Sequence, residues 1–211
     1  MVTVKTNQRI VEVPPITWDD VTTDSYQKLM AKLGKGLNND IVTLSHLYGL
    51  DYDLIESSTD QALYGTLMTL IRFISDDDLT KMPAPEYITY KDQAFMLKYS
   101  SLTIGQMLHL QREVQKRGTL EESISIAVAV ALQPLFDQTP FKSDRALEIE
   151  KDILLMPINR TYPIGFFYLR KFSTGGNVFT NAWHLLKMLT LTQTIRLLKS
   201  QGLRGLSHSQ I

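Results

Sequence analysis

Residues 119–136, TLEESISIAVAVALQPLF, constrain the fold of this chain more than any other stretch. Thr119 and Glu122 have the spacing of a capping box, in which two side chains satisfy backbone N–H groups at a helix start. The residues that follow are apolar on every side of a helix, and such a helix is covered on most of its faces. The β-branched residues leave a buried strand as an alternative, because short apolar runs do not separate the two by periodicity. The cap and the spacing of Ala127 and Ala131 favour a buried central helix.

The remaining patterns predict helices and small β elements around that central helix. Residues 2–13 predict an N-terminal strand with a candidate turn at Asn7 and Gln8, and residues 87–97 predict a β-hairpin. Further helices are predicted from Thr17, over 41–48, after the capping residues 57–60, from Ser101 or Thr103 to about 117, over 143–154 and over about 180–200. Two prolines are expected to frame a short apolar segment, 164–172, and Gly175-Gly176 is a candidate hinge. The fold class is therefore mainly α, a helical domain around 119–136 with one hairpin and an N-terminal strand.

Charge divides the chain into two parts of opposite sign. The final 59 residues hold seven basic and no acidic residues, and the first 152 hold 15 basic and 22 acidic residues. We therefore expect a mainly helical core domain over 1–156 and a basic C-terminal helical segment over 157–211, packed on the same domain. The basic segment predicts either an external acidic partner, protein or DNA, or attraction to the acidic N-terminal part of the chain. The partner-binding candidates are Arg170, Lys171, Lys187, Arg196, Lys199 and Arg204.

No pattern in the sequence indicates catalysis, a cofactor or a metal. The absence of cysteine excludes disulfides, thiolate metal sites and a cysteine nucleophile. The four histidines have no metal-ligand spacing, and Asp76-Asp77-Asp78 lacks the alternating oxygens and the glycine of a calcium loop. There is no nucleophile elbow and no phosphate-binding glycine loop. The N-terminus has no apolar signal region, and no apolar run reaches the roughly 18 to 20 residues of a membrane span. We therefore expect a non-enzymatic protein without cofactor, metal or membrane contact.

The aromatic residues of the basic segment allow two interpretations. Phe166, Phe167 and Tyr168 precede Arg170 and Lys171, and a basic surface with aromatic rings can bind a nucleic-acid strand. Alternatively, the rings belong to the core and the cations lie at a helix end, where they complement the helix dipole. The second interpretation is favoured.

Two stretches carry a resemblance to a known group of proteins. One is 16–22, ITWDDVT, which leads into a predicted helix, and the other is the hairpin 87–97 followed by SLTIGQ at 101–106. This order, two strands and then a helix opened by L-T-x-G-Q, resembles small tail-assembly chaperones and head–tail or baseplate proteins of tailed bacteriophages. The resemblance covers about a third of the chain and does not include the basic C-terminal segment.

The resemblance implies a non-enzymatic protein that docks on other phage proteins, located in the virion or the host cytoplasm. The leading hypothesis is a structural subunit of the neck, tail or baseplate that forms a homo-oligomer or binds other phage structural proteins. A tail-assembly chaperone that leaves the virion is one alternative. A nucleic-acid-binding module that uses the basic C-terminal segment is the other.

Overall fold

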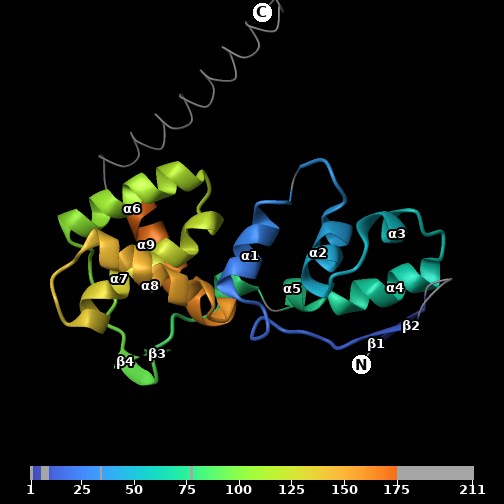
Figure 1. Cartoon of the computed structure of the whole chain (residues 1–211), viewed down its shortest axis with the longest axis horizontal. Coiled ribbons are helices and arrows are strands. Elements are labelled where there is room, and N and C mark those ends of the chain that lie inside the picture. Colours follow the sequence, from blue (N-terminus) through green and yellow to red (C-terminus); the bar gives the residue numbers. More distant parts are fainter. Residues whose placement is uncertain (1, 6–9, 34, 77, 175–211) are drawn as a thin grey trace, which may run out of the picture. The chain divides into compact units, whose positions relative to one another are not determined.

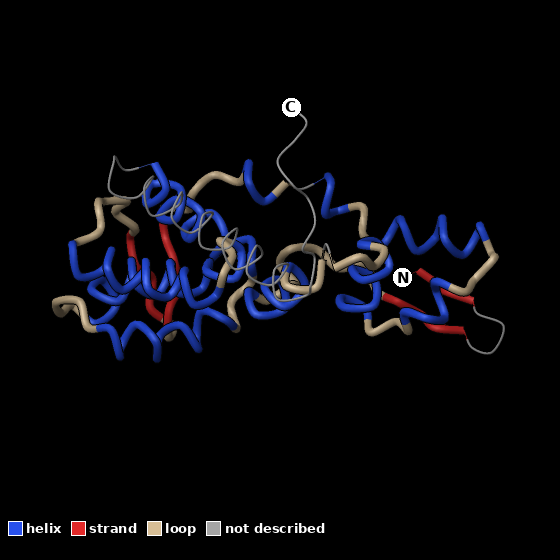
Figure 2. The backbone as a smooth tube through the Cα atoms, turned by 90° about the horizontal axis from the view of Figure 1, so that it is seen from above, coloured by secondary structure: helices blue, strands red, loops and turns tan. Residues whose placement is uncertain are grey.

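A computed structural model describes residues 2–5, 10–33, 35–76 and 78–174 of the chain. The described part is mainly helical, with two small antiparallel hairpins (Figures 1 and 2), and this confirms the expected fold class. Residues 2–169 belong to one compact unit, and a second unit begins at Arg170. The helix predicted over 180–200 and the hinge at 175–176 lie outside the described residues. The division expected after residue 156 stays a prediction.

The apolar stretch is the central helix of the compact unit. Helix α7 (Ile124–Asp137) packs against α8 (Ser143–Leu154), α6 (Ile104–Arg117) and α1 (Thr23–Met30), and its residues from Ile124 to Val130 are all buried. The helix interpretation is therefore confirmed and the strand alternative is wrong. The predicted start was too early, because a separate 3-10 turn, η2 (Glu121–Ser123), precedes the helix, and the Thr119 hydroxyl accepts a bond from the Glu122 N–H of this turn at 3.2 Å.

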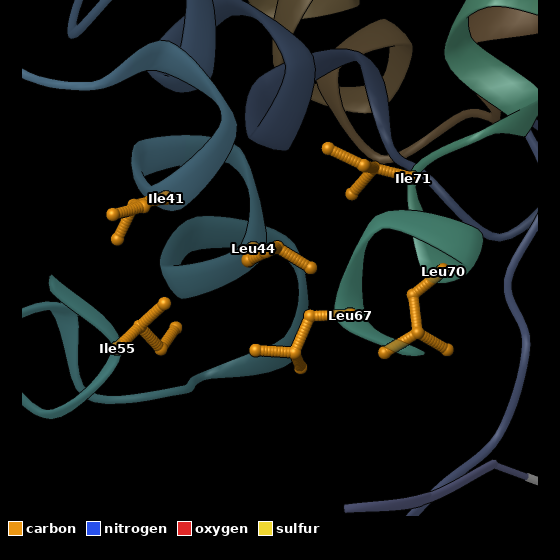
Figure 3. Close-up of a cluster of buried hydrophobic side chains, with 6 residues drawn as sticks. All are labelled: Ile41, Leu44, Ile55, Leu67, Leu70 and Ile71. Carbon is orange, nitrogen blue, oxygen red and sulfur yellow. The ribbon is translucent and has the colours of Figure 1, made fainter. Parts of the chain in front are cut away.

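A second group of helices packs around its own apolar cluster. These helices are α2 (Asn39–Tyr48), α3 (Tyr52–Glu56), α4 (Gln61–Leu70) and the short α5 (Phe73–Asp76). Figure 3 shows the buried side chains that α2, α3 and α4 contribute, together with Ile71 just after α4. The members of the cluster are Ile41, Leu44, Ile55, Leu67, Leu70 and Ile71. Helix α3 was not predicted, because only Ile55 among its five residues is buried and the segment has no apolar periodicity.

Both hairpins are antiparallel. Strand β1 (Val2–Lys5) pairs with β2 (Ile10–Val13), so the expected N-terminal strand is a pair of strands. Strand β3 (Tyr87–Tyr90) pairs with β4 (Gln93–Met96), as expected from the two apolar runs. The two-residue turn between them places Lys91 and Asp92 at φ values of 48° and 62°, the left-handed geometry that matches the twist of a tight hairpin. A 3-10 turn, η1 (Leu79–Lys81), precedes the second hairpin.

Two boundaries differ from the sequence prediction. Helix α1 begins at Thr23 and not at Thr17, because the Asp20 carboxylate accepts bonds from the Thr17 N–H at 2.8 Å and from its hydroxyl at 3.0 Å, which closes a turn. Helix α9 (Ile158–Thr174) runs through Pro163, where the prediction had a break. A proline inside a helix costs about 3 kcal/mol. Burial of Ile164 and Leu169, at about 1.5–3 kcal/mol each, offsets that cost.

Helix α9 crosses the start of α7 at a very short distance. A Cβ atom built on Gly165 would lie 2.9 Å from the Ile124 backbone oxygen and 2.9 Å from its Cγ2 atom. Glycine therefore permits the close approach that brings Ile158 and Ile164 into the core, where both are fully buried. Residues 21–23 also bind this region, since the Ile158 N–H donates to the Val21 carbonyl at 2.8 Å.

Candidate partner-binding surface

The predicted basic contact surface is described only at its first two residues. Arg170 and Lys171 are exposed near the end of α9. Lys187, Arg196, Lys199 and Arg204 lie outside the described residues, so their shared surface stays a prediction. Tyr168 is 4% exposed, and the Tyr99 ring lies 4.8 Å from that of Phe167 and 6.2 Å from that of Tyr168. These contacts favour the interpretation in which the aromatic residues belong to the core.

The outer face of the β3–β4 hairpin presents apolar side chains to solvent. Tyr87 and Met96 are directly opposite each other in the register, and each is 55% exposed. The inner face is fixed to the helices, because the Tyr90 ring stacks on Phe136 at 4.3 Å and the Tyr90 hydroxyl donates to Asp152 of α8 at 2.7 Å. Because side chains alternate between the two faces of a strand, this anchoring holds the Tyr87 and Met96 side chains on the face that points away from the helices.

The outer face of α6 carries a second apolar pair. Ile104 is 73% exposed and Leu108 is 50% exposed, and they lie one turn apart on the helix. The opposite face is held by Gln106, whose side chain completes a capping box with Thr103 and donates to the Val130 carbonyl of α7 at 2.7 Å. The stretch 102–106, LTIGQ, therefore has a structural role: it starts α6 and fixes its rotation, which leaves the two apolar side chains outside.

A buried ion-pair network was not found from the sequence. Arg117 at the end of α6 binds both carboxylate oxygens of Glu150 on α8, and Ser125 on α7 donates to Glu150 at 2.5 Å. Glu113 lies 3.8 Å from Arg117 and also accepts from Lys116 at 2.5 Å. Burial opposes the ionisation of Glu113, but the bond and charge of Lys116 and the charge of Arg117 outweigh it and hold its pKa below the ordinary value. The network joins three helices, so we assign it a structural role.

The two described histidines both lie in packed surroundings. The His46 ring lies 2.8 Å from the Ser25 carbonyl through Nε2 and 3.1 Å from Lys32 Nζ through Nδ1. His109 is 6% exposed, its ring lies 5.7 Å from that of Phe141, and its Nε2 atom has no hydrogen-bond partner. Burial lowers the pKa of His109 below its ordinary value. Over the described ranges, no three His, Asp or Glu side chains are grouped so that they could hold a metal ion.

A cleft of about 610 Å³ opens beside α2, α3 and α4. Its lining combines buried apolar residues of the cluster in Figure 3 with exposed carboxylates of Glu56 and Asp60. Sequence patterns did not reveal this cleft, because it depends on how three short helices meet. A signal for it is nevertheless visible in retrospect, since residues 47–71 contain four acidic and no basic residues.

The described helices include none that is long and apolar enough to cross a membrane. Comparisons with protein-family models, with curated proteins and with solved structures found no match to this chain. The resemblance of residues 16–22 and 87–106 to phage morphogenesis proteins therefore remains the basis for a hypothesis about function.

Proposed function

We propose that this chain is a non-enzymatic virion or assembly protein of a tailed bacteriophage that works through protein–protein contacts. One observation carries the proposal: the apolar pairs Tyr87/Met96 and Ile104/Leu108 are exposed on the stretch that resembles phage morphogenesis proteins, or within two residues of it. We name these four residues, which form two separate pairs on the hairpin and on α6, the 87–108 apolar face. Its role is docking on another phage structural protein, as a subunit of the neck, tail or baseplate.

The energetics of the 87–108 apolar face suit a docking role. Full burial of one large apolar side chain is worth about 1.5–3 kcal/mol, so covering the exposed half or more of each is worth about 1 kcal/mol per residue. Each pair is held on a regular element whose opposite side is anchored to α7. Binding therefore requires little ordering of the backbone, and less of the burial energy is lost to conformational entropy.

The tail-assembly chaperone is the closest alternative, because exposed apolar residues also serve a protein that binds its partner only during assembly. Both roles place the chain in the virion or the host cytoplasm and leave it without catalytic chemistry. The basic residues Arg170, Lys171, Lys187, Arg196, Lys199 and Arg204 remain our proposed second contact. DNA binding through this segment stays a prediction, and it requires an affinity that falls steeply with salt.

Particle incorporation of surface variants tests the proposal. Ile104→Asp and Met96→Asp change exposed side chains, so we expect the chain to remain folded while its content in phage particles falls at least tenfold. Gln115→Asp, on an exposed position of α6 outside the 87–108 apolar face, is the matched control and is expected to keep wild-type incorporation. Wild-type incorporation of both apolar-face variants would refute the proposed role of this face.

A further inference from the structure

The cleft beside α2, α3 and α4 joins an apolar floor to an acidic rim. Ile41, Ile55 and Leu67 belong both to the buried cluster of Figure 3 and to the lining of the cleft. Leu63 and Tyr64 extend the apolar lining along α4, and Tyr64 keeps 43% of its surface exposed. An apolar side chain that enters the cleft therefore adds to a core that already exists, which is the arrangement of an anchoring pocket.

The rim of the cleft is negatively charged. Glu56 accepts a bond from the Tyr52 hydroxyl at 3.0 Å, and Asp60 accepts bonds from the backbone N–H groups of Ala62 and Leu63 at 2.9 and 3.1 Å. These bonds position both carboxylates at the cleft and leave their charge uncompensated by any cation among the described residues that line it. The occupant with complementary chemistry is a basic segment that carries apolar anchors.

We infer that this cleft binds the basic C-terminal segment of a second copy of the chain. Residues 153–211 contain seven basic and no acidic residues, and Trp183, Leu186 and Leu189 recur along them at helical spacing. The first 152 residues, which include the cleft, hold seven more acidic than basic residues, and the final 59 hold seven basic residues. Because the two surfaces differ, the contact is heterologous and repeats from one copy to the next, as in a ring or a filament. The inference rests on the docking role proposed for the basic segment and names its partner.

Sedimentation equilibrium of the full-length chain and its charge variants tests this contact. We expect a mass above that of the monomer at low salt, which falls towards the monomer as salt screens the charges. Glu56→Lys is expected to weaken association about tenfold, since it replaces an attraction at the rim by a repulsion. Glu86→Lys makes the same charge change at an exposed position outside the cleft lining and is expected to leave association unchanged.

A mixing experiment separates a second copy from other occupants. The Glu56→Lys variant has an altered cleft and an intact C-terminal segment. The Lys187→Glu/Lys199→Glu variant has an intact cleft and an altered C-terminal segment. Each variant is expected to be mainly monomeric alone. An equimolar mixture is expected to form dimers, in which the intact C-terminal segment of one variant binds the intact cleft of the other. A wild-type chain that stays monomeric at every concentration, equal effects of Glu56→Lys and Glu86→Lys, or a mixture that does not associate would each overturn the inference. Failure here leaves the particle experiment unaffected, because that experiment depends on the 87–108 apolar face.

Discussion

Glu150→Gln is expected to destabilise the protein more than any other single charge removal among the described residues of α8. The Glu150 side chain is 9% exposed and accepts two bonds from Arg117 and one from Ser125. The substitution keeps the shape of the side chain and removes its charge. The Arg117 guanidinium, whose side chain is 23% exposed, then keeps the Glu113 carboxylate at 3.8 Å as an acidic neighbour. Breaking a buried pair on one side costs about 3–5 kcal/mol. The remaining exposure of Arg117 and the charge of Glu113 place the expected loss near the lower end, at about 3 kcal/mol.

Urea unfolding followed by far-ultraviolet circular dichroism measures this loss. In a thermal scan it corresponds to a fall in Tm of about 6–12 °C for a chain of this size. Glu148→Gln is the matched control on the same helix, because the Glu148 side chain is 57% exposed and its pair with Arg145 is expected to contribute less than about 1 kcal/mol.

The double variant Arg117→Met/Glu150→Leu separates charge burial from packing. Replacing both charges by apolar groups leaves no unpaired ion. We therefore expect the double variant to be more stable than Arg117→Met alone or Glu150→Leu alone. A loss below about 1 kcal/mol for Glu150→Gln, or a double variant whose loss equals the sum of the single losses, would refute the assigned role of the network.

Two further predictions concern packing and pH. Gly165→Ala is expected to lower the free energy of unfolding by about 1–3 kcal/mol, because its Cβ would lie 2.9 Å from the Ile124 backbone oxygen. Gly105→Ala is the control and is expected to be neutral or stabilising, since the nearest atom to its Cβ is Phe141 Cδ1 at 3.7 Å. Equal effects of the two substitutions in urea unfolding would contradict the close approach of α9 to α7. Burial lowers the pKa of His109 in the folded protein, so the unfolded chain binds the proton more readily. The stability of the wild type is therefore expected to fall as the pH drops through 6.5, and to level off below the pKa of the folded state. His109→Gln is expected to reduce this fall between pH 7 and pH 5, and identical falls in both proteins would count against a buried neutral imidazole.

The sequence predicted those elements whose ends are set by local chemistry. Helix α6 lies between Thr103, which caps it, and Gly118, which takes a left-handed φ of 91°, and both signals are adjacent in sequence to the helix they bound. The second hairpin was predicted for the same reason, since its turn and its alternation are local.

One error is local and the others depend on distant contacts. The start of α1 was missed because the Asp20 carboxylate accepts bonds from Thr17, three residues earlier, and these bonds compete with helix formation. The passage of α9 through Pro163 depends on burial against other helices. The pairing of Arg117 with Glu150 joins residues 33 positions apart, and the cleft is formed by three short helices. No local pattern specifies which residues of these helices meet, although the acidic run 47–71 indicates the charge of the cleft.

Sedimentation of a lysate from the source is the most direct test of the proposed docking on phage proteins. If the chain is a structural subunit, it is expected to travel with large particles at a fixed ratio to their other proteins. Recovery only in the slow fractions with a single partner would favour the assembly-chaperone alternative. Recovery only in the slow fractions without any partner would contradict the proposed docking role.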